Sequence, residues 1–211
     1  MMDFIKSYQA GLDIGSTTAK LAVVNQRGDI VFSAYQRHHT KIYETIDTIL
    51  DNALSQLGDS PIRLQITGSA GMGISEKTGI PFIQEIIATD VFVKNHHPEV
   101  KTLIDIGGED SKMIFFNEKS LPDIRMNGNC AGGTGAFIDQ IATLLNIETQ
   151  DLNTLAADHQ NVYPIASRCG VFAKTDVQNL LSRKIPKADV AASVFHAVAI
   201  QCRNTLARGF G

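Results

Sequence analysis

The 211-residue sequence lacks several features that would each assign it to a broad class of protein. It has no apolar run approaching 18 residues, which a membrane-spanning helix would need, and no signal-peptide core in residues 1–10. It has no long run of one charge, and a net charge of -3 argues against a nucleic-acid-binding tail. Its three cysteines are too few, and odd in number, for a disulfide framework. We therefore expect a cytoplasmic protein, whose 44 % of hydrophobic residues suffices for a folded core.

Two common nucleotide-binding motifs are also missing, the Gly-x-x-x-x-Gly-Lys-Ser/Thr loop and the Rossmann fingerprint. The sequence has an internal repeat instead, because residues 11–24 align with residues 103–116 at an offset of 92. The aligned pairs include Asp13 with Asp105, Gly15 with Gly107, and Lys20 with Lys112. Repeats at this spacing indicate duplicated domains, and we place them at residues 1–98 and 99–211.

Both halves predict the same order of elements. A three-stranded meander leads to an amphipathic helix, a short strand, a glycine turn and a second helix. In the first half, the repeat is followed by a strand at 30–35, a helix at 43–57, a strand at 63–67 and a turn at 68–73. In the second half, it is followed by a strand at 121–126, a helix at 137–145, a strand at 162–166 and a turn at 167–170. Cys169 thus occupies the corner that Gly68 and Ser69 hold in the first half.

The polar turn in each copy of the repeat suits phosphate. An aspartate that ends an apolar strand can hold Mg²⁺, and the glycine and hydroxyl residues after it offer N–H and O–H donors. The candidate residues are Asp13, Gly15, Ser16, Thr17, Thr18 and Lys20 in the first turn, and Asp105, Gly107, Gly108, Glu109 and Asp110 in the second. Either turn alone is typical of an ordinary hairpin, but two copies favour a nucleotide clamped from both sides. Asp105 could then orient an attacking water or help to bind the metal.

A third stretch, residues 127–135, is rich in glycine and opens into the helical pattern at 137–145. Free N–H groups and the positive end of the helix dipole would favour phosphate there, and equally a thiolate at Cys130. The candidate phosphate-binding residues are Gly132, Gly133, Thr134 and Gly135. Cys130 and Cys169 each precede a helical pattern among glycine or polar residues. Cys202 lies in an apolar helical stretch, so we expect it to be a small buried hydrophobe.

Two pairs of adjacent histidines, at 38–39 and 96–97, lie at the edges of predicted elements. Adjacent residues do not share one face of a helix or strand, so a metal role is not favoured. We interpret all four as solvated loop residues.

These motifs carry a family resemblance. Residues 11–20 and 105–112 resemble the two phosphate motifs of the superfamily that includes actin, sugar kinases and Hsp70 chaperones. Within it, residues 127–135 and 167–176 are similar to the BadF/BadG/BcrA/BcrD-type ATPases. That family comprises the iron–sulfur ATPase activators of 2-hydroxyacyl-CoA dehydratases and the ATPase subunits of benzoyl-CoA reductase. The resemblance implies an α/β, actin-like (ribonuclease H-like) fold of duplicated domains with mixed sheets.

The resemblance also implies a function. It predicts an ATPase that forms a homodimer with one [4Fe–4S] cluster between the subunits, held by Cys130 and Cys169 of each. ATP hydrolysis would drive the transfer of one low-potential electron to a 2-hydroxyacyl-CoA dehydratase-like or benzoyl-CoA reductase-like iron–sulfur partner. We expect neither nucleic acid nor a membrane as a binding partner. Two thiols per chain make half of the four-thiolate shell that such a cluster needs.

The sequence departs from the family pattern in places. Many members have alanine at the position of Gly132, glutamine at Glu109 and glutamate at Lys174. The superfamily's C-terminal Gly-Gly loop, which holds adenosine, is not reached, so we expect a truncated second domain whose apolar surface at 190–206 is uncovered. Two alternatives stay open: a sugar or acyl kinase with Asp105 as its base, and a nucleotide-switched binding module of the actin or chaperone type. Only the electron donor needs both cysteines.

Overall fold

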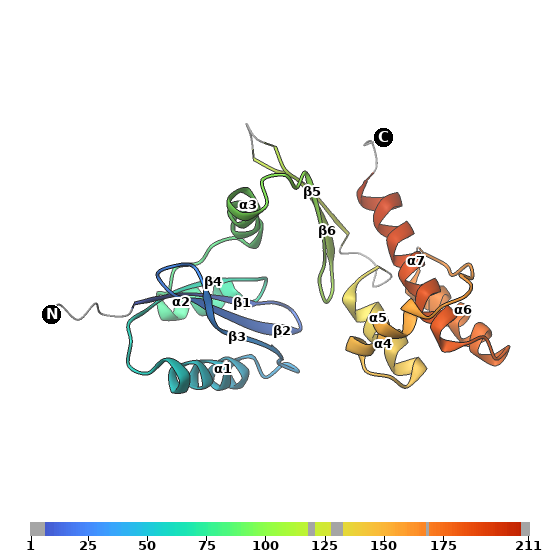
Figure 1. Ribbon diagram of the computed structural model, residues 1–211, viewed down its shortest axis with the longest axis horizontal. Helices are drawn as coiled ribbons and strands as arrows, with labels where there is room; N and C mark the ends of the chain where they lie inside the picture. Colours follow the sequence, from blue (N-terminus) through green and yellow to red (C-terminus); the bar gives the residue numbers. More distant parts are fainter. Residues whose placement is uncertain (1–6, 118–120, 128–132, 168, 208–211) are drawn as a thin grey trace. The chain divides into compact units, whose positions relative to one another are not determined.

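The computed structural model describes residues 7–117, 121–127, 133–167 and 169–207 (Figure 1). The chain divides into two compact units, Met1–Pro98 and Glu99–Gly211. Each unit has its own hydrophobic core, formed where the apolar faces of its sheet and helices meet. No helix in the described part of the chain is both long and apolar enough to cross a membrane.

Unit 1 is built on a four-stranded sheet in the order β3-β2-β1-β4. Its strands are β1 (Tyr8–Ile14), β2 (Thr18–Val24), β3 (Ile30–Arg37) and β4 (Ile62–Thr67). The first three form the predicted antiparallel meander, and β4 pairs in parallel with β1, so the sheet is mixed. Side chains alternate along β1, which buries Ala10, Leu12 and Ile14 and leaves the intervening residues more exposed.

The helices of unit 1 are α1 (Ile42–Leu57), α2 (Gly71–Thr78) and α3 (Glu85–His96). Ile46, Ile49 and Ala53 recur at helical spacing on α1, and this buried face packs against β2 and β3. Figure 1 shows α1 lying along one face of the sheet. α2 begins inside the predicted 68–73 turn, and the N–H just before it, that of Ala70, donates to Ile14 O at 2.9 Å.

Unit 2 begins with a second antiparallel meander, in the order β5-β6-β7. Its elements are β5 (Thr102–Ile106), β6 (Ser111–Phe115), β7 (Asp123–Asn127), α4 (Gly135–Leu145), the 3-10 helix η1 (Thr149–Asp151), α5 (Leu152–Ala157), α6 (Gly170–Ser182) and α7 (Lys187–Leu206). Asp105 faces Lys112 across β5 and β6, as Asp13 faces Lys20 across β1 and β2. The repeat in the sequence is therefore also a repeat of strand register.

The long helix α7 forms the centre of the core of unit 2. It contacts α4, α5, α6, β6 and β7, and the side chains of Val190, Val194 and Leu206 are at most 1 % exposed. The expectation that residues 190–206 would be uncovered is therefore wrong, because these helices and the sheet cover them. Cys202 is buried among the same side chains, as predicted. Burial raises the pKa of its thiol.

The predicted strand at 162–166 does not form. Backbone N–H groups of this segment donate to side chains instead of a strand: Tyr163 N to Ser193 Oγ at 2.8 Å, and Ala166 N to Asp176 Oδ2 at 2.9 Å. Pro164 has no N–H to offer to a ladder. The segment is thus an irregular stretch tied to α6 and α7, and it does not pair as β4 does in unit 1.

Candidate functional site

The first candidate site is the hairpin that joins β1 to β2. The N–H of Gly15 donates to Thr18 O at 2.9 Å and closes a tight turn over Ser16 and Thr17. Ser16 is exposed and Thr17 is half-buried, so both lie at the surface of the turn. Thr18 is 6 % exposed, so its hydroxyl belongs to the packed strand rather than to the surface of the loop.

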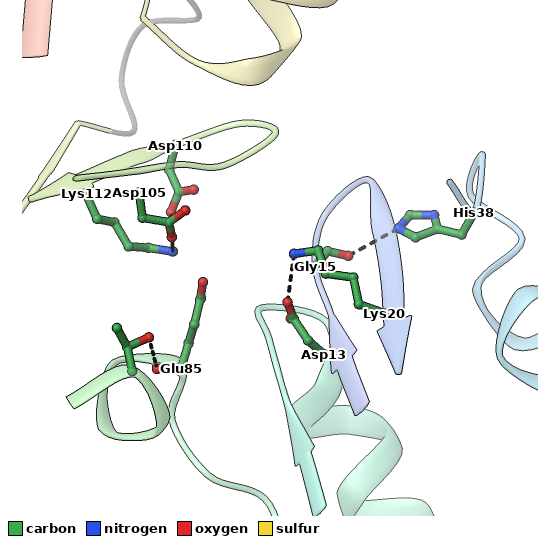
Figure 2. A network of polar contacts seen from close by, with 9 residues as sticks. Asp13, Gly15, Lys20, His38, Glu85, Asp105, Asp110 and Lys112 are labelled. Carbon is green, nitrogen blue, oxygen red and sulfur yellow. Dashed lines mark hydrogen bonds and ion pairs between the residues drawn. The ribbon is translucent and has the colours of Figure 1, made fainter. Parts of the chain in front are cut away.

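Asp13 and Lys20 form an ion pair at the base of this hairpin. Lys20 Nζ lies 2.8 Å from Asp13 Oδ2, and both side chains remain partly exposed (Figure 2). Gly68, directly after β4, lies against Asp13 and Ile14 with φ of 93°, and a Cβ there would overlap the Asp13 carboxylate and the Ile14 carbonyl. Only glycine satisfies both the positive φ and this close approach. The sequence identified Gly68 as part of a turn but did not show that it packs against Asp13.

His38 is a second residue that the sequence analysis missed. The expectation of a solvated loop histidine is wrong for it, because His38 is 4 % exposed. Its ring contacts the hairpin through Nε2, which lies 3.1 Å from Gly15 O, and Nδ1 lies 3.2 Å from Thr40 N. The available signal was its position directly after β3, whose last residue, Arg37, pairs with Thr18. His39 is exposed, as expected.

The second candidate site is the hairpin that joins β5 to β6. Lys112 Nζ lies 3.2 Å from Asp110 Oδ2 and 3.7 Å from Asp105 Oδ2, so one buried ammonium group forms ion pairs with two carboxylates. The Asp110 side chain lies over Gly107. Glu109 is exposed at the tip of the turn, and the Asp105 carboxylate is partly exposed. Asp105, Asp110 and Lys112 thus form one charged cluster (Figure 2).

The start of α4 binds this second hairpin directly. Gly135 N donates to Gly107 O at 2.7 Å, and Ala136 N donates to Gly108 O at 2.9 Å. These two N–H groups are therefore not free to face a phosphate in this structure, in contrast to the expectation for the helix start. Thr134, the N-cap residue, is buried, and Gly133 lies beside Gln201 of α7. Gly132 and Cys130 lie outside the described residues.

Cys169 is the N-cap residue of α6, where the positive end of the helix dipole favours a thiolate. Its thiol is half-buried and free of any disulfide. The carboxylate of Asp176, from the second turn of α6, holds the N–H of Ala166 three residues before the cysteine. Within the described ranges no three or more His, Cys, Asp or Glu side chains form a metal-binding group. The predicted pairing of Cys169 with Cys130 is not tested, because Cys130 is not described.

A buried carboxylate anchors the segment that leads toward Cys169. Asp189, in the first turn of α7, accepts hydrogen bonds from Gln160 N at 2.8 Å, Asn161 N at 3.2 Å and Asn161 Nδ2 at 3.3 Å. The Gln160 N–H contributes most to lowering the pKa of Asp189, although burial opposes this. The Asp189 carbonyl also accepts a hydrogen bond from Ser193, which binds Tyr163 N. The irregular 160–166 segment is thus fixed mainly by side chains of helices.

A repeated antiparallel meander whose first hairpin carries an aspartate and a glycine fits an ATPase of the actin-like fold. The chain belongs to the BadF/BadG/BcrA/BcrD ATPase family, which it matches over residues 10–210. The predictions of the family and of an α/β, actin-like fold class are therefore confirmed. The expected truncation of the second domain is not confirmed, and the described sheet of unit 2 is antiparallel rather than mixed.

Characterised relatives are similar over most of this chain. It is 32 % identical over 197 residues to the (R)-2-hydroxyglutaryl-CoA dehydratase activating ATPase of Acidaminococcus fermentans. This alignment covers 91 % of this chain and 74 % of that protein. It is 31 % identical over 205 residues to the 2-hydroxyisocaproyl-CoA dehydratase activator of Clostridioides difficile, covering 91 % and 73 %. The solved structure of the latter activator from Clostridium difficile, with bound ADPNP, superposes with a TM-score of 0.84 at 30 % identity, covering 93 % of this chain and 74 % of that one.

Proposed function

We propose that this ATPase is an activator that uses ATP hydrolysis to pass one electron, at low potential, to a 2-hydroxyacyl-CoA dehydratase-like iron–sulfur enzyme. The observation that carries the proposal is the free thiol of Cys169 at the start of α6. It belongs to a chain whose relatives are named as dehydratase activators. A kinase or a nucleotide-switched binding module has no need of a thiol at this position.

The nucleotide part of the proposal rests on the two hairpins. Each would bind phosphate oxygens through backbone N–H groups and side chains, with Mg²⁺ beside the aspartates. The proposed residues are Asp13, Gly15, Ser16, Thr17, Thr18 and Lys20 in the first hairpin, Asp105, Gly107, Gly108, Glu109 and Asp110 in the second, and Gly132, Gly133 and Thr134 before α4. Gly135, the first residue of α4, would position this loop through the hydrogen bond from its N–H to Gly107 O. Mg²⁺ suits the oxygen donors of Asp13 and Asp105, whose carboxylates are both partly exposed. Asp105 would orient the attacking water.

The electron-transfer part requires a [4Fe–4S] cluster shared by two copies of the chain. A two-fold axis places the same residues on both sides, so two cysteines per chain give four thiolates. Cys169 fits this use, because its thiol is free, half-buried and at a helix start that favours negative charge. Cys130 would supply the second thiolate of each chain. When bound, such a cluster supplies a single electron at low potential.

The test is anaerobic reconstitution with iron and sulfide, followed by iron analysis and electron paramagnetic resonance of the reduced protein. We expect about four irons per dimer in the wild type. Cys130→Ser and Cys169→Ser should each lose the cluster, because each removes two of its four ligands.

The matched control is Cys202→Ala, which should keep the cluster because Cys202 is a packed residue of the apolar core. Alanine avoids burying an unpaired hydroxyl at this position. If both single variants at Cys130 and Cys169 retained a full cluster, the electron-donor function would be refuted, and the kinase alternative would replace it.

A further inference from the structure

The imidazole of His38 has a hydrogen-bond partner at both nitrogens. Nε2 lies 3.1 Å from the carbonyl oxygen of Gly15, and Nδ1 lies 3.2 Å from the backbone nitrogen of Thr40. A carbonyl oxygen only accepts and a backbone N–H only donates, so Nε2 carries the proton and Nδ1 carries the lone pair. The surroundings of the buried ring therefore select one neutral tautomer.

His38 holds the first hairpin at two points. Its side chain binds Gly15 O, and its own backbone N–H donates to Thr17 O at 3.2 Å. Figure 2 shows the ring directed at the Gly15 carbonyl from the end of β3. The carbonyl groups of Gly15 and Thr17 are thus turned toward His38.

This arrangement decides which side of the hairpin presents its donors. In a trans peptide the C=O of one residue and the N–H of the next point in opposite directions. With Gly15 O and Thr17 O held by His38, the N–H groups of Ser16 and Thr18 point away from it. Phosphate is attracted by N–H groups and repelled by carbonyl oxygens, so the hairpin presents its binding side opposite to His38.

The turn after His38 is unusual in a way that serves this contact. His39 and Thr40 have φ values of 45° and 67°, although neither residue is glycine. Such left-handed residues are disfavoured and persist where the surrounding structure demands them. This turn brings Thr40 N back to the ring, and Lys41 N donates to His38 O at 2.6 Å. The strained turn therefore fixes the orientation of the ring.

We propose that His38 is a positioning residue, which keeps the N–H side of the Gly15–Thr18 hairpin turned outward for the phosphates of ATP. The proposal deepens the function proposed above and rests on it, because it requires this hairpin to bind phosphate. His38 itself touches neither the nucleotide nor the metal. It acts through the Gly15 and Thr17 carbonyl groups.

Two substitutions separate the two ring contacts. His38→Gln places an amide N–H₂ near the position of Nε2, so it keeps a donor for Gly15 O and loses the acceptor for Thr40 N. His38→Asn places an amide oxygen near the position of Nδ1, so it keeps that acceptor and loses the donor. Each variant loses one hydrogen bond, and a purely structural role would lower the melting temperature of both alike without separating their affinities. His39→Asn is the control, because His39 is exposed and asparagine tolerates a positive φ.

The measurement is the dissociation constant for ATP, and for inorganic triphosphate as a second ligand, by calorimetry of the 211-residue chain and its variants, with melting temperatures taken alongside. We expect His38→Asn to weaken ATP binding about fivefold, the equivalent of one net hydrogen bond. His38→Gln and His39→Asn should stay within about twofold of the wild type. Nitrogen NMR of the wild-type imidazole should show a protonated Nε2 and an unprotonated Nδ1.

Two results would overturn the inference alone, provided that the wild type binds ATP. One is that His38→Asn and His38→Gln have equal affinities for ATP, and the other is that the imidazole of His38 has the opposite tautomer. A wild-type chain that bound neither ATP nor inorganic triphosphate would overturn the proposed function, and this inference with it. The two failures are therefore distinguishable in one set of experiments.

Discussion

Lys20 donates a hydrogen bond of 2.8 Å to Asp13 across the β1–β2 ladder, where the two residues are direct register partners. Lys112 and Asp105 are register partners in the same way, but their charged atoms are 3.7 Å apart. Lys112 is buried and also serves Asp110, whereas the side chain of Lys20 is 43 % exposed. The duplicated pair has therefore diverged. The side chain of the first lysine stays accessible beside one aspartate, and the second lysine pairs with two carboxylates.

Removing the Asp105 carboxylate should reduce ATP turnover much more than ATP binding. We expect Asp105→Asn to lower kcat about a hundredfold, since a positioned acid–base group typically contributes that much or more. The dissociation constant should change less, because in the proposed site the phosphates are held by backbone N–H groups rather than by this carboxylate. Steady-state hydrolysis and calorimetric binding measure the two quantities.

The control for this experiment is Asp123→Asn, at an exposed carboxylate of the same sheet that pairs only at 3.7 Å with Arg125. It should keep wild-type turnover. Unchanged kcat in Asp105→Asn would contradict the role of Asp105 in hydrolysis.

Alanine at Gly68 should destabilise the protein more than alanine at Gly79. Both glycines have positive φ, 93° and 72°, so each alanine incurs a left-handed penalty of about 1 kcal/mol. A Cβ at Gly79 meets nothing within 4 Å, whereas at Gly68 it would overlap Asp13 and the backbone of Ile14. We expect the clash to cost roughly 2 kcal/mol more in free energy of unfolding, measured with urea. Equal costs for the two variants would show that Gly68 does not pack against Asp13.

Asp189 should make stability depend on pH in the acid range. Its pKa is lowered in the folded protein, so its contribution is fully present above its unfolded pKa of about 3.9 and is lost as pH falls through the folded value. We expect Asp189→Asn to be less stable than the wild type at neutral pH, with the difference shrinking below about pH 4. Urea unfolding from pH 3 to 7 measures this, and Asp158→Asn, at an exposed site, is the control. A constant difference across this range would contradict the assignment.

Asp176 should restrain the segment before Cys169. Asp176→Ala leaves the Ala166 N–H without its partner, which we expect to cost about 1–2 kcal/mol of stability. Asp176→Asn keeps an acceptor oxygen and serves as the control. Cys169 should react faster with iodoacetamide in the alanine variant only, as followed by peptide mapping. Equal rates in all three proteins would show that Asp176 does not restrain the cysteine.

The sequence predicted the hairpins well because the information there is local. An apolar strand that ends in aspartate and glycine favours a turn at that point, so the equivalence of Asp13 with Asp105 and of Lys20 with Lys112 followed from one alignment. The register pairing of each aspartate with its lysine came from the structure. The same locality explains the burial of Cys202, which lies in a helical stretch of small apolar residues. Prediction failed where distant side chains decide the backbone, as at 162–166, where Ser193 and Asp176 take N–H groups that a strand would have used.

His38 and the start of α4 were missed for a related reason. Nothing in the sequence near His38 shows that the Gly15 carbonyl, 23 residues earlier, will take its Nε2–H. The N–H groups of Gly135 and Ala136 looked free, because their acceptors lie in a hairpin 28 residues before them. Contacts of this kind depend on tertiary structure, and a pattern of residue types does not specify them.

The central place of α7 in unit 2 has a consequence for the order of events on the ribosome. The core of unit 1 draws on residues up to Phe82, so it can close early in synthesis. The core of unit 2 needs Leu206, about 120 residues later, which is roughly 6–25 s at typical elongation rates. As α4, α5 and α6 are made within that interval, the helix faces that α7 will cover stay exposed on the nascent chain until α7 is complete. A newly made chain is therefore most dependent on chaperones between the closing of its first core and the arrival of α7.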